Sequence, residues 1–397
     1  MLVVLAAVLI TLAALPFASA RPTTGRFLLS LALLALHLAA TIAYYAYTQS
    51  NVSDARGYYF DPYNFSKQAF ALGTVFTYKF TQFLRADLGG SYFGCFLFFQ
   101  SIGFWGVIML MRTFEEIALK IHAREQILPK LLLFLPSIHF WTSAIGKDAP
   151  MFFAISLCTW AVLELRKRIV FFGIAMLVMV LFRPHMALIA VTALAAAAFF
   201  HREIVFGRKV PLLAVTVVGG IFLAGTVQAT LGVDVTDFSS LASFLDERNE
   251  IAGMIGGGSS IGDAPLTIRL LSLLFRPLFF DAQNIAGAVA SFENIGSLLL
   301  FAYFAKNWFA VRHLAKRVFF VEFAMMFSIA TIATLTAVYY NIGLGLRQRI
   351  MIFPPLLSVF VATWAFRQRQ PAPVAAHAPG GLAMPGETYN ALTGTVR

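Results

Sequence analysis

The sequence predicts an all-α fold: a polytopic integral membrane helical bundle with about eleven transmembrane helices. Of its 397 residues, 59% are hydrophobic and only 12% are charged. The hydrophobic residues form runs close to the ~20 residues that a helix needs to cross a membrane. The charged residues are bunched between these runs, and no polar segment is long enough to form a separate soluble domain.

Eleven apolar runs are the predicted spans. In chain order they cover residues 2–20, 27–47, 91–111, 128–145, 149–165, 169–182, 186–200, 210–228, 286–305, 318–338 and 350–366. The first run ends in Ala18-Ser19-Ala20, which resembles a signal-peptidase site. No basic residue precedes it, however, and Arg21 and Arg26 suit a cytoplasmic turn. We therefore expect a retained helix rather than a cleaved signal peptide.

The connections between the spans alternate in charge. One set holds 19 of the 30 Lys and Arg residues and 7 of the 19 acidic residues, so its net charge is +12, against −1 for the other set. Connections rich in Lys and Arg face the cytoplasm. The N-terminus is therefore predicted outside and the C-terminus inside. The net charge of +11 follows from this topology and predicts no nucleic-acid partner.

Two of the outer connections are long, and they cover residues 48–90 and 229–285. The transmembrane domain is predicted over residues 1–369. The tail, residues 370–397, is rich in Pro, Ala and Gly without apolar periodicity, so we expect it to be disordered in the cytoplasm.

Two hairpins are short for a membrane. The hairpin of residues 169–200 has legs of about 15 residues, which span roughly 22 Å of a ~30 Å hydrocarbon core. Its tip, Arg183-Pro184-His185, is therefore predicted below the outer surface. The hairpin of residues 128–165, with Lys147 and Asp148 at its tip, is only slightly longer. Charges at such depth are costly unless they are paired or solvated, so we expect an outward-opening cavity.

The outer face carries a scattered set of cationic candidates for binding phosphate, because guanidinium groups pair bidentately with phosphate oxygens. They are Lys147, Arg183, His185, Arg248, Arg269, Arg276, Arg347 and Arg349. Each could instead be an anchor that snorkels to the membrane interface. We expect Lys147 and Arg183 to share one cavity and one anion, since Asp148 could neutralise Lys147 but not Arg183 as well.

Asp54 is the candidate general base of this face, because a carboxylate there could accept the proton of a sugar hydroxyl. The alternative is a solvated acid that pairs with Arg56. Inside the spans, we expect a packing role for His37 and a pair between Glu322 and Lys316 or Arg317. No phosphate loop, dinucleotide fingerprint or metal-ligand motif is present in the sequence, so we expect no cofactor and no metal.

Several segments resemble a known group of membrane proteins. The segment from Pro136-Ser137 through Phe140-Trp141 to Lys147-Asp148-Ala149 resembles a hairpin of EpsG-like and broader Wzy-like bacterial exopolysaccharide polymerases. Further segments of that group recur here in the same order, over roughly residues 50 to 365: Arg183-Pro184-His185, Phe275-Arg276-Pro277, Ser291 to Asn294 and Asn341 to Arg349.

This resemblance implies an inner-membrane glycosyltransferase that acts at the periplasmic face on undecaprenyl-diphosphate-linked oligosaccharides, as a repeat-unit polymerase. Its partners would be the bilayer, the lipid-linked substrates and other polysaccharide-assembly proteins. Asp54, Arg183 and Arg347 would be catalytic. The diphosphate ligands would be Lys147, His185, Arg248, Arg276 and Arg349.

Three alternatives remain open at the level of sequence. A transporter or flippase of lipid-linked sugars would also place cations in an outward cavity, and it would usually show repeat symmetry, which we do not find. A ligase or a monosaccharide transferase would use the same cavity with another acceptor. A non-catalytic partner of an assembly complex would tolerate the loss of single arginines.

Overall fold

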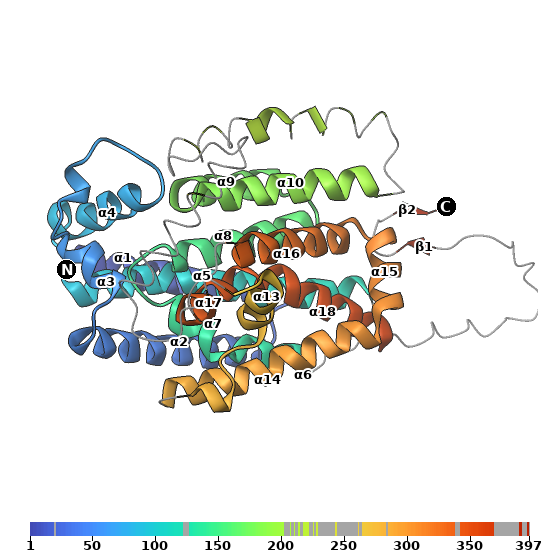
Figure 1. Ribbon diagram of the computed structural model, residues 1–397, viewed down its shortest axis with the longest axis horizontal. Helices are drawn as coiled ribbons and strands as arrows, with labels where there is room; N and C mark the ends of the chain where they lie inside the picture. Colours follow the sequence, from blue (N-terminus) through green and yellow to red (C-terminus); the bar gives the residue numbers. More distant parts are fainter. Residues whose placement is uncertain are drawn as a thin grey trace, which may run out of the picture.

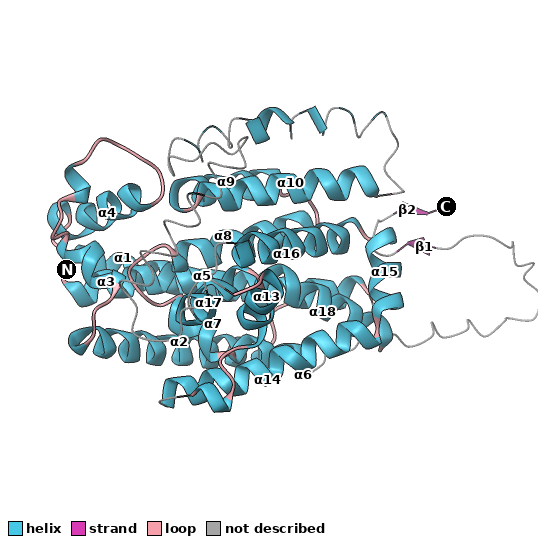
Figure 2. Ribbon diagram, viewed as in Figure 1, coloured by secondary structure: helices cyan, strands magenta, loops and turns pink. Residues whose placement is uncertain are grey.

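The computed structural model describes residues 1–19, 21–121, 127–201, 264–282, 285–337 and 342–368, with isolated positions between 202 and 263 and after 388. Nearly all of this is helix (Figure 2). The helices are α1 (Leu2–Ala14), α2 (Thr24–Ser50), α3 (Asp54–Phe60), α4 (Thr74–Gln82), α5 (Tyr92–Lys120), α6 (Ile127–Leu131), α7 (Pro136–Trp141), α8 (Asp148–Val162), α9 (Ile169–Phe182), α10 (Pro184–Phe200), α13 (Leu266–Phe275), α14 (Ile285–Lys306), α15 (Trp308–Arg317), α16 (Phe319–Ala337), α17 (Ile342–Gln348) and α18 (Phe353–Arg367).

Shorter elements extend or link these helices. They are the 3-10 turns η1 (Leu15–Ala18), η2 (Phe65–Lys67), η4 (Leu132–Phe134), η5 (Phe279–Asp281) and η6 (Arg349–Met351), and the π-helical turn η3 (Phe83–Asp87). In the tail, the two-residue strands β1 (Tyr389–Asn390) and β2 (Thr395–Val396) pair antiparallel. The rest of the predicted disordered tail lies outside the described residues.

The helices lie roughly along one axis, with α3 and α4 at one end of the bundle and α15 across the other (Figure 1). We call these the α3–α4 end and the α15 end. Helix α5 is at the centre, where it packs most extensively against α8 and α1. The face of α1 that meets α5 presents Val3, Ala7, Thr11 and Ala14, at the three- and four-residue spacing of one helix face.

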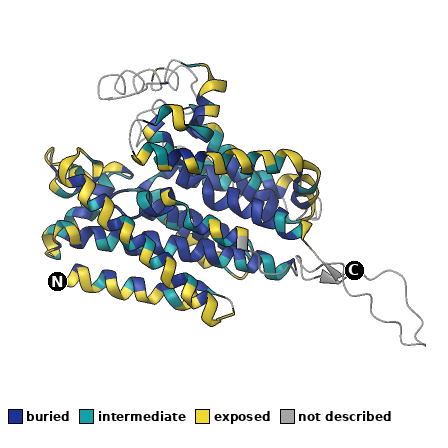
Figure 3. Cartoon of the chain, turned by 90° about the horizontal axis from the view of Figure 1, so that it is seen from below, coloured by how far each residue is buried: buried dark blue, intermediate teal, exposed yellow. Residues whose placement is uncertain are grey.

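The core is apolar and dense. Fully buried phenylalanines such as Phe104, Phe152 and Phe323 fill the space between α5, α8 and α16. A smaller cluster of buried aromatic and aliphatic side chains, including Tyr44 and Phe96, lies near the α3–α4 end. Buried residues follow the inner helix faces, and exposed residues follow the outer ones (Figure 3).

The outer faces are themselves apolar. On α14, Phe292 is 69% exposed and Leu299 is 66% exposed, and α1, α2 and α9 also expose rows of Leu, Val and Ile. Soluble monomers rarely expose continuous apolar surface of this kind, whereas a lipid-facing helix requires it. The apolar helices and their apolar exterior therefore indicate a membrane protein, as the sequence predicts.

Four of the described helices are long and apolar enough to cross a membrane: α2, α5, α14 and α16. A fifth span would consist of residues Ile342–Met351 and Phe353–Arg367, which meet at a bend of 60°. The predicted all-helical membrane fold is thus confirmed, but the predicted count of about eleven spans is not. The other predicted spans either form helices of 10 to 17 residues or, as for most of residues 210–228, lie outside the described residues.

Candidate functional site

Five charged side chains from four separate parts of the chain meet at the α3–α4 end. We call them the tip cluster: Asp54, Lys147, Asp148, Arg183 and Arg347. Asp54 begins α3, Lys147 and Asp148 lie where the chain enters α8, Arg183 separates α9 from α10, and Arg347 lies in the last turn of α17. Three cations around two carboxylates give this cluster a net charge of +1 when Lys147 is protonated.

Asp148 joins the two arginines of the cluster. Its Oδ1 accepts a hydrogen bond from Arg183 at 2.8 Å, and its Oδ2 accepts one from Arg347 Nε. The Asp148 side chain is only 6% exposed, so it is a fixed support for both guanidinium groups. Here the sequence prediction was wrong in one respect. Asp148 neutralises Arg183 and Arg347, and Lys147 makes no ion pair with a carboxylate among the described residues.

Asp54 is the accessible carboxylate. Its side chain is 57% exposed, and it accepts a hydrogen bond from Arg347. Burial by itself would raise the pKa of the Asp54 carboxyl, but Arg347 and the more distant charges of Lys147 and Arg183 hold that pKa below its ordinary value. The predicted alternative partner, Arg56, instead donates to the backbone oxygens of Thr48 and Gln49.

Lys147 has spare capacity for an anion. Its ammonium group donates to the hydroxyl of Thr74, at 2.7 Å. Burial, together with the nearby charge of Arg183, lowers the pKa of Lys147 to about 7. The Nε of Arg183 is also buried, and it has no partner in the part of the chain that the structure describes. An anion bound here would accept hydrogen bonds from these donors.

The backbone beside the tip cluster is closely packed. Gly146 adopts a φ of 150°, which L side chains rarely adopt, and a Cβ there would lie 3.4 Å from the Tyr58 ring and 3.9 Å from Arg347. Burial raises the pKa of Tyr58, so its hydroxyl stays protonated. The amide of Gly73 donates to the carbonyl of Leu181 at 2.8 Å, which holds the start of α4 against the end of α9.

His185, another predicted ligand, follows Arg183 on the first turn of α10 and lies close enough to interact electrostatically with Arg183 and Lys147. Arg248, also predicted, lies outside the described residues. The structure thus brings together Asp54, Lys147, Arg183 and Arg347, with His185 beside them.

Two predicted phosphate ligands have other contacts. Arg349 is 3% exposed and donates to the backbone oxygens of Leu274 and Arg276, at 3.1 and 3.0 Å, and to the side chain of Asn294. Arg276 pairs with Asp281, with Nε 3.0 Å from Oδ2. Both arginines therefore hold the α13–α14 connection together.

The two remaining sequence candidates also have internal partners. Arg269 is buried and donates to the carbonyl of Ala337. Glu322, expected to pair with Lys316 or Arg317, instead contacts His201 Nδ1 at 2.6 Å. The reason is that His201, at the end of α10, packs directly against the start of α16.

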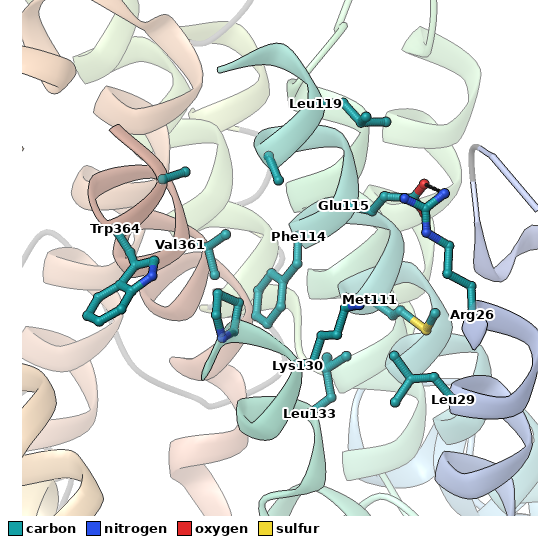
Figure 4. Close-up of a pocket in the computed structure, with 13 residues that line it drawn as sticks. Arg26, Leu29, Met111, Phe114, Glu115, Leu119, Lys130, Leu133, Val361 and Trp364 are labelled. Atoms are coloured by element: carbon teal, nitrogen blue, oxygen red, sulfur yellow. Dashed lines mark ion pairs between the residues drawn. The ribbon is translucent and has the colours of Figure 1, made fainter. Parts of the chain in front are cut away.

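A second polar region lies at the α15 end. Glu116 accepts from Arg112, from Arg168 and from the indole of Trp160, at 2.8 to 3.0 Å. A pocket beside this region is lined by α2, α5, α6 and α18, and Figure 4 shows its ion pair between Arg26 and Glu115, at 2.8 Å. Its lining is mostly apolar, and Arg26 and Glu115 neutralise each other, which leaves Lys130 as one further cation of the lining. The tip cluster, where three cations converge, is the stronger candidate for an anion site.

Sequence reasoning placed Asp148 at the hairpin tip as a partner of Lys147, and it missed that Asp148 supports both arginines. It considered Tyr58 only as an aromatic ring that could stack on a sugar. Thr74, the partner of Lys147, has no signal in the sequence. Comparisons with protein families, with curated proteins and with solved structures gave no match to this chain.

Proposed function

We propose that the tip cluster binds the diphosphate group of a membrane-anchored sugar donor, and that the protein is a membrane glycosyltransferase. The reaction would be repeat-unit polymerisation on undecaprenyl-diphosphate-linked oligosaccharides at the periplasmic face of the bacterial inner membrane. The observation that supports this best is the convergence of Lys147, Arg183 and Arg347 at one end of the bundle. They leave one positive charge and several donors without an anion.

The two carboxylates of the cluster suit different tasks. Asp148 is buried and orients both guanidinium groups, so its task is to position them. Asp54 is accessible, but while Arg347 is its partner its lowered pKa makes it a weak base. A bound diphosphate would draw Arg347 away from Asp54 and leave that carboxylate available for a proton.

The chemistry then balances as follows. A hydroxyl of the acceptor sugar attacks the anomeric carbon of the donor and gives its proton to Asp54. The bond between that carbon and the diphosphate oxygen breaks, and its electron pair leaves with the lipid diphosphate. Lys147, Arg183 and Arg347 stabilise the charge that develops on the leaving group, which is the main electrostatic requirement of such a transfer.

Transport of the lipid-linked sugar is the other candidate function. It would need a polar path from the tip cluster to the α15 end. Among the described residues, the space between these ends is filled by buried apolar side chains such as Phe104, Phe152 and Phe323. This packing favours transfer at one face over passage through the bundle.

Binding of undecaprenyl diphosphate to the reconstituted protein tests the proposal. Arg183→Gln and Arg347→Lys should each weaken binding about tenfold to a hundredfold, the equivalent of one charge-assisted hydrogen bond. The control is Arg85→Gln, at the same end of the bundle, where Arg85 contacts the Tyr59 ring and carbonyl. Equal affinity of all four proteins, or equal binding of undecaprenyl monophosphate, would refute the diphosphate site.

Proton uptake gives a second, independent readout. Because the pKa of Lys147 is about 7, an arriving diphosphate should raise it and take up protons between pH 7 and 8. Calorimetry in buffers of different ionisation enthalpy measures this uptake. Lys147→Arg keeps the charge but cannot titrate, so it should bind the lipid without proton uptake. Binding without uptake by the wild type would mean that Lys147 does not meet the diphosphate.

A further inference from the structure

Two histidines lie in contact halfway along the bundle. His37 is 13 residues from each end of α2, which places it roughly 20 Å from both ends of that helix. His139 lies on α7, and both side chains are fully buried. Their Nδ1 atoms are 3.1 Å apart, and the rings meet edge to face.

The outer nitrogens of both rings have partners that can only accept. His37 Nε2 lies 3.2 Å from the backbone oxygen of Gln100, and His139 Nε2 lies 2.8 Å from that of Leu133. A carbonyl oxygen has no proton to give, so each Nε2 must carry a hydrogen for these contacts to be hydrogen bonds.

The protons of the pair can therefore be counted. A neutral imidazole carries one ring proton, so two neutral rings that both donate from Nε2 would turn two bare Nδ1 lone pairs toward each other at 3.1 Å. One additional proton converts this repulsion into an Nδ1–H···Nδ1 hydrogen bond. All three contacts are made only when the two rings share three protons.

Among the described residues, no other ionisable side chain makes a hydrogen bond or ion pair with either ring. The ionisable side chains of the elements packed on α2 and α7 have other partners or lie toward the ends of those elements. They are Arg26, Tyr44, Tyr45 and Tyr47 of α2, Tyr92, Cys95, Arg112, Glu115, Glu116 and Lys120 of α5, Glu293, Tyr303 and Lys306 of α14, Arg347 of α17 and Arg349 of η6. Glu293 accepts from the amide of Ser137, and Tyr44 stacks on Phe140 at 4.5 Å. Turns η1 and η4 carry no ionisable side chain.

We propose that His37 and His139 form a proton-binding site in which one proton is shared between the two Nδ1 atoms. The two rings titrate as one unit, because the second ring cannot gain a proton at Nδ1 without losing the shared bond. Ionisable groups at this depth in a membrane protein are costly to keep unless they have a task. The site is independent of what the tip cluster binds.

The protonation state of the pair can also affect the position of Lys147 at the tip of the hairpin. Loss of the shared proton breaks the link between α2 and α7, and α7 leads within six residues of its end to Lys147. The segment between them packs closely on α5, since a Cβ on Gly103 would lie 2.0 Å from the carbonyl oxygen of Thr142. Protonation of the pair therefore biases where the tip of this hairpin lies.

Solid-state NMR of the full chain in lipid bilayers, with ¹⁵N-labelled histidine, tests the proposal without any variant of the pair. Contacts to ¹³C-labelled carbonyls of Gln and Leu identify the two rings. We expect three protonated nitrogens among the four at mildly acidic pH, a through-bond coupling between the two Nδ1 atoms, and loss of one proton in a single step as the pH rises. His313, which is exposed, supplies an internal reference signal outside the pair.

Two results would overturn the proposal. One is a pair in which both Nδ1 atoms remain unprotonated at every pH at which the protein is folded. The other is a pair in which each ring takes up its own proton at Nδ1, in two steps and without coupling.

Discussion

Arg347 and Arg349 lie two residues apart and have different environments. The hydrogen bonds that Arg347 donates to described residues go to two carboxylate side chains, Asp54 and Asp148, at the α3–α4 end. Arg349 is buried and donates to two backbone oxygens and to Asn294. Helix α17 continues directly into η6 with helical backbone at Gln348, and residues two positions apart on a helix point to nearly opposite sides, which explains the difference.

Arg349→Met should lower the stability of the protein, whereas Arg347→Gln should change it little. The Arg349 change leaves buried oxygens without donors, at a cost of about 1–3 kcal/mol. After the Arg347 change, Asp148 keeps Arg183 and Asp54 is solvated. Thermal unfolding of the purified proteins measures both. An equal Tm for the two variants would contradict the structural role of Arg349.

The stability of the protein should depend on the ionisation of Lys147. Burial lowers the pKa of this residue from its ordinary 10.5 to about 7, so the unfolded chain binds the proton more tightly than the folded one. The free-energy cost of burying the charged ammonium group is full below pH 7 and vanishes above pH 10.5. The unfolding free energy of the wild type, relative to that of Lys147→Gln, should therefore rise with pH across this window. A constant difference in unfolding free energy between wild type and variant over this range would show that Lys147 is not desolvated.

Helix α5 and the segment that follows α7 approach each other closely because of one glycine. Gly103 faces the carbonyl of Thr142, just beyond α7, and a Cβ there would overlap that backbone atom. This approach places His139 beside His37 and sets the course of the chain toward Lys147. A local choice of residue in α5 thus supports both polar sites.

Gly103→Ala should destabilise the protein by about 1–3 kcal/mol, because the backbone must shift to admit a methyl group. Gly173→Ala in α9 is the matched control, since no atom lies within 4 Å of a Cβ at that position. The control should be neutral or more stable by up to about 1 kcal/mol, as glycine is a poor helix former. Similar unfolding curves for the two variants would mean that α5 and the segment after α7 are not packed this closely.

At the scale of the whole molecule, each end of the bundle carries its own group of charged side chains. The α15 end carries Arg112, Lys120 and Arg168 with their glutamate partners, and the tip cluster lies at the α3–α4 end. The alternation of basic connections along the sequence predicts that the α15 end faces the cytoplasm.

Cysteine labelling of intact cells tests this orientation. Val52 is 99% exposed near the tip cluster, and the Lys167 side chain is 79% exposed at the α15 end. An impermeant thiol reagent should modify Val52→Cys in intact cells and Lys167→Cys only after permeabilisation. The native Cys95 and Cys158 are buried and should give little background. The reverse labelling pattern would invert the topology and remove the tip cluster from the periplasm.

Much of this protein could be predicted from the sequence because apolar run length and charge placement are local properties. The boundaries of α2, α14 and α16 lie within three residues of the predicted spans, since the same runs of hydrophobic residues determine them. Helix α5 begins as predicted but continues nine residues past its predicted end, to Lys120. The cations of the tip cluster were found because each lies at the end of an apolar run, where a charge is conspicuous.

Only the tertiary structure decided which of those charges meet. Asp54 and Arg347 are 293 positions apart, Asp148 and Arg347 are 199 apart, and His37 and His139 are 102 apart. Contacts over such separations depend on which helix faces pack together and at what depth, and the hydrophobic period of a helix buried on most sides carries little of that information. The sequence by itself therefore determined a helical membrane protein with cationic candidates at its hairpin tips. Packing decided that Arg347 joins Asp54 and Asp148, that Arg349 supports the fold, and that two histidines face each other in the core.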